Sequence, residues 1–341
     1  MSHTLQAPSH NIITVDFGGT DSKVALFDGR LRQIGETQRI GTNPEQSPQQ
    51  WSERVSDIAK TKGWEFNYAG ISAPSALNFD GVMLNPPNLR HPNWNRCNLA
   101  EIFFEITKKR AVVSNDGDCA SYFTHQSHFG QDSNSKVSCF RGIGTGLAGA
   151  LNIEGKVFRG RSGVSSEAGH TRSAHMDFLP ACLKTNWEGR TDKGRIKDEE
   201  LFCRTGTTLL FQHLASLQPS HPISSKIKSI GLDDTSKMLF EFARDNKEAK
   251  EILTFQMKLL GRHLANVDAL LHPDVFFIGG GIFDKGEDYK ELIVEMLEVT
   301  TAQYEIERHP KLITPAEIKI VELGSYAQLH GAAIYAQRNL S

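Results

Sequence analysis

One local plan occurs twice in this chain of 341 residues: an apolar run, a glycine turn, a second apolar run and a tight turn. The first copy is residues 12–29, IITVDFGGTDSKVALFDG, and the second is residues 137–160, VSCFRGIGTGLAGALNIEGKVFRG. Apolar runs bounded by glycine predict β-strands, so each copy predicts a meander. Two copies, in a chain longer than the usual single domain, predict two related domains.

The glycine turns differ from both common phosphate loops. A P-loop and a dinucleotide fingerprint each lead from a strand into a helix, whereas strands are expected here over residues 23–27 and 31–39. Glycine lets backbone N–H groups approach an anion, and Thr20 and Thr145 add hydroxyl donors. Either copy alone is also consistent with an ordinary hairpin. The two copies together predict that the chain holds a phosphate chain.

Composition argues against several functions. A formal net charge of -2 without a basic cluster disfavours nucleic acid as a partner. The five cysteines are scattered, with no C-x-x-C pair, which favours reduced thiols. The first ten residues are polar, unlike a signal peptide, and no apolar run reaches the ~20 residues of a membrane-spanning helix. We therefore expect a soluble, cytoplasmic protein without a membrane partner.

Six segments in a fixed order carry a resemblance to a known family. They are VDFGGTDSK at 15–23, VVSNDGDCA at 112–120, GIGTGLAGALNIEGKVFRG at 142–160, EAGH at 167–170, PDVFFIGGGIF at 273–283 and GSYAQLHGAAIYA at 324–336. In this order they resemble the ROK family of bacterial sugar kinases, which includes glucokinases and belongs to the sugar kinase, Hsp70 and actin superfamily.

The resemblance implies an α/β fold of two duplicated actin-like (ribonuclease H-like) lobes around a central cleft. It places the N-terminal lobe at residues 1–120 with 326–341, and the C-terminal lobe at residues 121–325. Apolar positions from Ile252 to Leu271 predict one long helix, and a strand is expected over 275–278. By analogy a last helix, from about 326 to 339, returns to the first lobe.

Asn115 and Asp116 follow an apolar run, residues 111–113, and are expected at the carboxyl end of a strand, where ligands gather in α/β folds. Phosphoryl transfer needs a carboxylate that takes the proton of the attacking hydroxyl. Asp116 is the candidate base, and Asn115 is expected to orient the sugar. Asn-Asp-Gly alone is also a common turn, and Asp118 is a competing carboxylate. In the family pattern the base directly follows the asparagine.

Glu167 and His170 offer a carboxylate and an imidazole three residues apart, which suits a hydroxyl-rich substrate. By resemblance both contact the sugar ring. In most family members this histidine also binds zinc together with a C-x-C-G-x-x-G-C segment, which this chain lacks, so no zinc site is predicted. A further family glutamate falls at Glu199 or Glu200, and Glu200 is the residue assigned to the sugar.

Substrate choice is expected in the loop NPPNLRHPNWNRCN, residues 85–98, because its prolines enforce an irregular backbone. Asn88 matches a family position near the substrate. Trp94 either stacks on a sugar face or belongs to the core.

The residues expected to bind the phosphates and the nucleotide lie in three glycine-rich segments with two charged neighbours. They are Asp16, Gly18, Gly19, Thr20, Lys23, Gly144, Thr145, Gly146, Gly279, Gly280 and Gly281. The resemblance implies that Asp16 faces the Mg²⁺ of magnesium ATP through water, since Mg²⁺ keeps much of its hydration. The bare backbone at 279–281 is expected beneath the adenosine. ATP is the expected donor and polyphosphate the alternative.

Together these features predict an ATP-dependent sugar kinase that transfers the γ-phosphoryl group to a hexose hydroxyl. Glucose is the first expectation, with glucose 6-phosphate entering glycolysis; an N-acetylated hexosamine, mannose and fructose are alternatives. A sugar-binding regulator without catalysis is a further alternative. Only about ten residues precede the first expected strand, however, which is too few for the helix-turn-helix domain of the family's repressors. A homodimer is one possible assembly.

Overall fold

The computed structural model describes most of the chain. The described residues are 10–18, 21–86, 89–144, 146–164, 166–172, 174–175, 195–217, 219–220, 224–225, 241–281, 283, 289–311, 314–323 and 326–341. Contacts divide the chain into two units. The first comprises Met1–Ser135, Leu151–Ser165 and Gly324–Ser341, and the second comprises Lys136–Ala150 and Ser166–Leu323. The sequence-based division places the first boundary at residue 120, which lies within a helix of the first unit.

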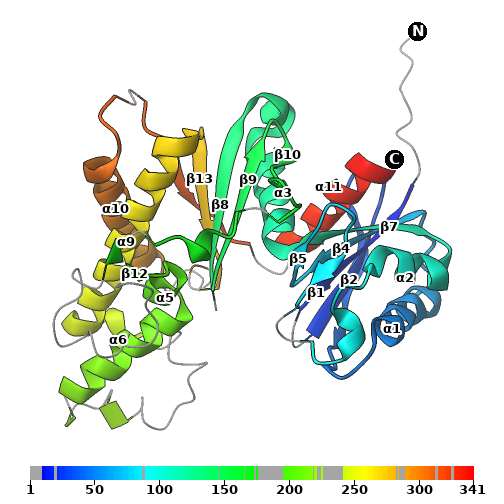
Figure 1. Ribbon diagram of the computed structural model, residues 1–341, viewed down its shortest axis with the longest axis horizontal. Helices are drawn as coiled ribbons and strands as arrows, with labels where there is room; N and C mark the ends of the chain where they lie inside the picture. The colour runs from blue at the N-terminus through cyan, green and yellow to red at the C-terminus, as the bar shows by residue number, and fades with distance from the viewer. Residues whose placement is uncertain are drawn as a thin grey trace. The chain divides into compact units, whose positions relative to one another are not determined.

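The first unit is built on a five-stranded sheet of order β3-β2-β1-β4-β7 (Figure 1). Its strands are β1 (Ile12–Phe17), β2 (Asp21–Phe27), β3 (Gln33–Gly41), β4 (Tyr68–Ala73) and β7 (Arg110–Asn115). The first three form the expected antiparallel meander, and β1 has the bounds that the sequence predicts. Strands β4 and β7 continue the sheet in parallel to β1.

Helices cover both faces of this sheet (Figure 1). They are α1 (Pro48–Thr61), α2 (Leu99–Thr107), α3 (Asp116–Phe129) and α11 (Ala327–Leu340). Alternation along β1 sends Val15 and Phe17 into a core with Trp51 of α1. On the opposite face Phe27 of β2 packs against Leu329 of α11. The last helix thus groups with the first unit by its contacts.

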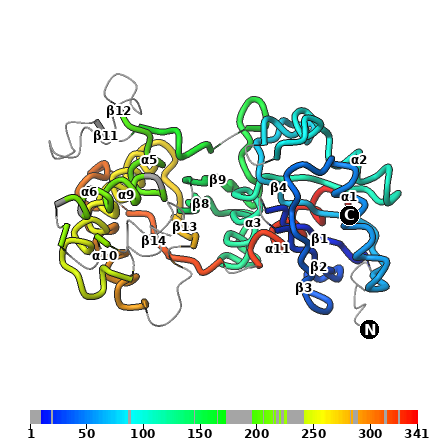
Figure 2. Tube along the Cα trace, turned by 90° about the horizontal axis from the view of Figure 1, so that it is seen from below, coloured from blue at the N-terminus to red at the C-terminus, as the bar shows by residue number. Residues whose placement is uncertain are grey.

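A second sheet has the same plan, of order β10-β9-β8-β13-β14. Its strands are β8 (Val137–Ile143), β9 (Leu147–Ile153), β10 (Lys156–Val157), β13 (Val275–Gly279) and β14 (Glu317–Ile320). Contacts group Leu151–Ser165, and so β10, with the first unit. Strands β8, β13 and β14 run parallel. Helices α9 (Lys247–Leu271) and α10 (Lys290–Glu307) pack side by side next to this sheet (Figure 2). The long helix α9 confirms the prediction over residues 252–271.

Shorter elements connect these layers. They are β5 (Ala76–Leu77), β6 (Met83–Leu84), η1 (Pro92–Trp94), η2 (Gly130–Ser135), η3 (Ala168–His170), β11 (Ala174–His175), β12 (Arg195–Ile196), α5 (Glu199–Phe202) and α6 (Arg204–Leu217). Within the part of the chain that the structure describes, no helix combines the length and the apolar character needed to cross a membrane.

Candidate active site

Two predicted site residues face each other at one edge of the first sheet. Strands β1, β4 and β7 are parallel, so their carboxyl ends meet at this edge. Asp16 of β1 pairs in register with Lys23 of β2, and Lys23 Nζ lies 3.0 Å from Asp16 Oδ2. Both side chains are mostly buried, at 18% exposed for Lys23 and 15% for Asp16. Lys23 therefore balances the charge of a carboxylate that water only partly screens.

A chain of hydrogen bonds supports Gly18, which follows β1. Trp51 Nε1 donates to Ser22 Oγ (3.1 Å), Ser22 Oγ donates to Thr42 Oγ1 (3.2 Å), and Thr42 Oγ1 donates to the Gly18 carbonyl (2.8 Å). The indole N–H can only donate and the carbonyl can only accept, which fixes this direction. Gly18 leaves no room for a side chain, because a Cβ there would lie 2.4 Å from the Asp21 carbonyl oxygen. Sequence reasoning missed this support, since no short motif joins its members.

The candidate base starts a helix at the same sheet edge. Asp116 is the first residue of α3, and Asn115 is its N-cap. Asn115 Oδ1 accepts from the Gly117 N–H (2.9 Å), and Asn115 Nδ2 donates to the Ser75 carbonyl (3.1 Å). Asp116 Oδ1 accepts from the Gly117 N–H as well (2.8 Å). The amino end of a helix favours negative charge, so this position suits an ionised carboxylate, which a general base requires.

Asp116 and Asp16 occupy one edge of one sheet. Strand β7 is two positions from β1, which corresponds to about 10 Å at the usual strand spacing. Burial is the main cause that raises the pKa of the Cys119 thiol, and Asp118, Asp116 and Asp16 raise this pKa further. Asp118 is only 7% exposed, whereas Asp116 is half-buried. Of the two competing carboxylates, Asp116 is therefore the more accessible.

The predicted substrate loop is described in part. Asn88 of this loop lies outside the described residues. The same holds for Gly19, Thr20 and Thr145 of the two glycine turns. Trp94 is fully buried, and its Nε1 donates to the Gln46 carbonyl (2.8 Å). Its ring packs on Phe17, with 5.0 Å between the ring centroids. Trp94 is thus a core residue and does not offer a face to a sugar.

The glycines of the second unit gather at the carboxyl edge of its sheet. The Gly144 N–H donates to the Gly146 carbonyl, and the Arg204 N–H donates to the Gly144 carbonyl, both at 3.0 Å. Strand β13 ends at Gly279 beside Gly142 of β8. The structure thus brings the segment 279–281 next to the second glycine turn.

Gly280 allows the backbone of residues 279–281 to lie close to the end of β8. It has φ +116°, and a Cβ there would lie 2.1 Å from the Ile143 carbonyl oxygen. Around Gly144 and Gly281, by contrast, no atom lies within 4 Å of the Cβ position. The space beside these two glycines is therefore not filled by other described atoms.

The predicted sugar residues of the second unit lie around η3. Glu167 is the N-cap of this turn and His170 is its last residue, and both are exposed. Glu199 Oε2 lies 2.7 Å from the Cβ position of Gly169 and 3.0 Å from that of Gly146. Glu199 therefore lies close to both η3 and the glycine turn. Glu200 follows it in α5 and is half-buried.

The donor groups fit a hydrated Mg²⁺ better than a metal enclosed by protein. No cluster of three or more His, Cys, Asp or Glu side chains with the geometry for a metal occurs among the described residues. Mg²⁺ in kinases is held by one or two carboxylates, by water and by phosphate oxygens. A single carboxylate, such as that of Asp16, is therefore sufficient on the protein side. Cys203 is buried with a free thiol, and Cys182 lies outside the described residues. The absence of a zinc site stays a prediction.

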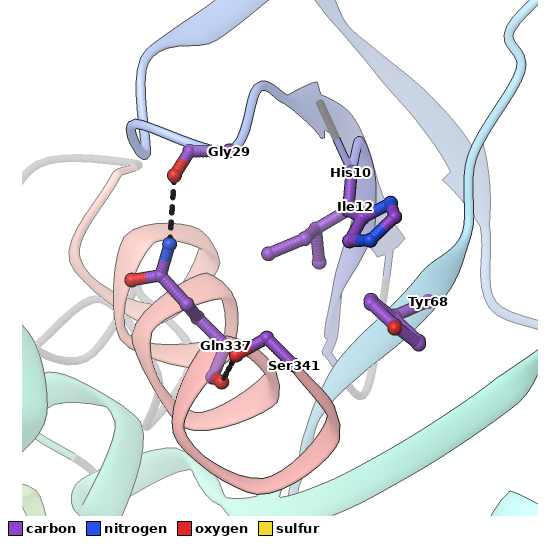
Figure 3. Close-up of a pocket in the computed structure, with 6 residues that line it drawn as sticks. All are labelled: His10, Ile12, Gly29, Tyr68, Gln337 and Ser341. Atoms are coloured by element: carbon purple, nitrogen blue, oxygen red, sulfur yellow. Dashed lines mark hydrogen bonds between the residues drawn. The ribbon is translucent and has the colours of Figure 1, made fainter. Parts of the chain in front are cut away.

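A cavity of about 230 Å³ opens at the other end of β1 (Figure 3). It is lined by His10, Ile12, Gly29, Tyr68, Gln337 and Ser341. None of these residues is a predicted site residue. Ile12 is the first residue of β1, whereas Asp16 lies near the other end of the same strand. Gln337 Nε2 already donates to the Gly29 carbonyl across this cavity (2.8 Å). The cavity is thus separate from the candidate active site.

Two curated proteins and one solved structure illustrate what the chain is similar to. It is 24% identical to the glucokinase of Thermotoga maritima, with 82% of this chain and 84% of that protein covered. It is also 24% identical to an N-acetylmannosamine kinase of Vibrio cholerae, with 89% and 93% covered. A ROK family glucokinase from Streptomyces griseus, solved with glucose and AMPPNP, superposes with a TM-score of 0.70 at 23% identity, covering 96% of this chain and 100% of that chain.

The structural likeness confirms the expected fold, in which two actin-like lobes each carry a five-stranded sheet with helices. A sequence model of the ROK family matches residues 12–339, which confirms the resemblance seen in the six segments. The chain therefore belongs to the ROK family.

Proposed function

We propose that this chain is an ATP-dependent sugar kinase that transfers the γ-phosphoryl group to a hexose hydroxyl, with Asp116 as the general base. The observation that carries the proposal is the shared edge of the first sheet. There Asp116 begins α3 directly after β7, and Asp16 lies near the carboxyl end of β1, which is parallel to β7 through β4. Lys23, near the amino end of the antiparallel strand β2, pairs with Asp16 at the same edge. This edge offers a proton acceptor and a cation for phosphate oxygens, and phosphoryl transfer requires both.

In the proposed step the sugar hydroxyl oxygen attacks the γ-phosphorus, and its proton passes to the Asp116 carboxylate. The new O–P bond forms as the bond between the γ-phosphorus and the β–γ bridging oxygen breaks, and ADP leaves with that electron pair. Asn115 orients the sugar, and its amide is itself fixed by the Ser75 carbonyl. Lys23 and the backbone N–H groups of the glycine turns bind phosphate oxygens. Mg²⁺, which neutralises phosphate charge, would be held by Asp16 through water.

Glucose is the proposed substrate, and an N-acetylated hexosamine is the closest alternative. The similarity to a glucokinase and to an N-acetylmannosamine kinase at equal identity supports a hexose without deciding between them. Glu167, His170 and one of Glu199 and Glu200 are proposed to bind the sugar hydroxyls. A site that hydrogen-bonds a hydroxyl rejects an analogue that lacks it, so the choice of sugar is expected to be sharp.

A substrate panel tests the function directly. ADP release would be measured with ATP and Mg²⁺ against glucose, mannose, fructose, N-acetylglucosamine and N-acetylmannosamine, and sugar phosphate would be measured with polyphosphate as donor. Turnover of at least one sugar is expected. Measurable sugar binding without turnover of any sugar would contradict the proposal and favour a regulator without catalysis.

Replacement of the candidate base gives a sharper test. For Asp116→Asn we expect kcat to fall by roughly 10²- to 10⁴-fold, the usual contribution of a general base, while sugar affinity measured by calorimetry changes little. Asp118→Asn is the comparison, since it removes the competing carboxylate two residues away. A turnover within about tenfold of wild type for Asp116→Asn would exclude this base.

A further inference from the structure

A network of buried charged side chains lies behind the Glu167–His170 turn. Arg141 of β8, His263 of α9 and Asp198, the N-cap of α5, are 5%, 1% and 0% exposed. Arg141 Nε donates to His263 Nε2 (2.9 Å), and His263 Nδ1 lies 2.9 Å from Asp198 Oδ2. The network therefore joins a strand, a long helix and a short helix that lie far apart in the sequence.

Arg141 and Asp198 determine which nitrogen of the His263 imidazole carries the proton. Arg141 Nε always carries a hydrogen, so His263 Nε2 must accept, and the histidine proton resides on Nδ1 and is donated to Asp198. Burial lowers the pKa of His263, and the nearby Arg141 lowers it further, against the raising effect of Asp198. A neutral imidazole thus bridges a buried cation and a buried carboxylate.

Three contacts connect this network to the turn, one of which places the Thr171 hydroxyl 3.3 Å from His263 Nδ1. The Asp198 N–H donates to the Thr171 carbonyl (2.9 Å). The Thr171 hydroxyl lies 2.6 Å from Asp198 Oδ2 and 2.6 Å from the carbonyl of Ala168, the first residue of η3. Thr171 directly follows His170, so Asp198 holds the carboxyl end of the turn through backbone and side chain.

The opposite side of the turn is held by close packing. A Cβ on Gly149 would lie 2.6 Å from the Ser166 carbonyl oxygen and 2.6 Å from Ala168 Cβ. The turn therefore rests on β9 on one side and on Asp198 on the other. Burying a cation and a carboxylate costs free energy that their attraction seldom recovers, so stability alone gives little reason for this arrangement.

We infer that Arg141, His263 and Asp198 form a clamp that, through Thr171, positions Glu167 and His170 for the hydroxyls of the substrate. This inference rests on the proposed function, because it assigns Glu167 and His170 to sugar binding. The clamp residues are positioning residues: they act through the turn and take no part in the phosphoryl transfer.

Thr171→Val tests the clamp with little change in shape. We expect KM for the sugar to rise about tenfold, as for the loss of a hydrogen bond to a charged acceptor, with KM for ATP within about twofold of wild type. Thr171→Ser keeps the hydroxyl and should restore KM for the sugar. Thr300→Val is the matched control, since its buried hydroxyl bonds the Met296 carbonyl within α10 (2.9 Å), away from the turn. An unchanged KM for the sugar in Thr171→Val, or equal rises in both KM values, would overturn the inference.

Hydrogen exchange provides a readout that needs no activity. The amides of His170 and Thr171 donate within the turn, to Glu167 and Ala168. Their exchange should accelerate in Thr171→Val and in His263→Leu but not in Thr171→Ser; unchanged exchange in both of the first two variants would contradict the clamp. Should the wild-type protein turn over no sugar, the proposed function falls, and exchange alone decides whether the turn is clamped.

Discussion

At the residue scale, the contact between Lys23 and Asp16 leads to a prediction about the affinity for ATP. In Lys23→Met the Asp16 carboxylate loses its partner at 3.0 Å, and the proposed phosphate contact disappears with it. Because hydrogen bonds between charged groups contribute more than neutral ones, we expect KM for ATP to rise by roughly ten- to a hundredfold. KM for the sugar should change far less. Both values follow from initial rates with the hexose that the wild-type enzyme phosphorylates.

Lys136→Met is the matched control for this variant. Lys136 Nζ also lies 3.0 Å from a carboxylate oxygen, that of Asp274, but this pair is about twice as exposed. Lys136 directly precedes β8, so it lies at the opposite end of that strand from the glycine turn. Exposed pairs contribute little, so its kinetics should match wild type. If both variants affected KM for ATP equally, the role of Lys23 would reduce to general charge.

Single residues differ in how far the sequence predicts them. Asp116 and Asp16 follow apolar runs within short motifs, so their place at strand ends could be predicted, and the structure has both there. The sequence does not distinguish a core role for Trp94 from a ligand-binding one, because burial depends on contacts across the fold. Arg141 and His263 are 122 positions apart, and no local pattern brings them together.

At the element scale, glycine allows two helices of the first unit to approach closely. A Cβ on Gly331 of α11 would lie 1.8 Å from the Cys119 carbonyl oxygen of α3. For Gly331→Ala we therefore expect the free energy of unfolding to fall by about 1–3 kcal/mol, the usual cost of overpacking. The better helix propensity of alanine offsets at most about 1 kcal/mol of this loss. Urea denaturation measures the difference.

Gly41→Ala serves as the control for this substitution. Gly41 ends β3, no atom lies within 4 Å of its Cβ position, and its φ is not in the left-handed region. Its unfolding free energy should stay within about 0.5 kcal/mol of wild type. Equal stability of Gly331→Ala and wild type would mean that α11 and α3 can separate at no cost.

The strands β1, β2 and β13 could be predicted because each contains a short apolar run bounded by turn residues. Helix α9 could be predicted because its apolar residues repeat with a helical period. Helix α3 could not be predicted in the same way, since it is nearly as polar on one side as on the other. It begins within Asn-Asp-Gly, which by itself is equally typical of a turn. Tertiary contacts with α11 decide in favour of the helix.

At the scale of the whole molecule, the duplication is clearer in topology than in sequence. Both sheets consist of a three-stranded meander followed by two parallel strands, in the orders β3-β2-β1-β4-β7 and β10-β9-β8-β13-β14. The glycine turns occupy equivalent places, between the first and second strands of each meander. Hydrophobic pattern and turn chemistry suffice to specify such a plan, so two copies can share it with few identical residues.

The two units also share a dependence on pH, because in each of them burial lowers the pKa of a histidine. Burial lowers the pKa of His263 in the second unit and of His330 in the first from the ordinary value of 6.5. Arg141 and Asp198 face His263, and the rings of Phe27, Phe123 and Tyr326 surround His330. As the pH falls below 6.5, the unfolded chain takes up protons that the folded chain refuses, so stability should fall with pH.

The slope of the unfolding free energy against pH shows whether these histidines are responsible for the decline. His263 alone can contribute up to about 1.4 kcal/mol per pH unit below 6.5, and His330, which is only half-buried, contributes less. Carboxylates with lowered pKa, such as Asp28 and Asp274, lose their contribution only near pH 4 and so act in a separate window. Urea unfolding should therefore give constant stability from pH 8 to 7 and a decline from 6.5 to 5. In His330→Phe the decline should become shallower but persist, because His263 remains; a wild-type stability that is equal at pH 7.5 and 5.5 would show that both histidines titrate freely in the folded protein.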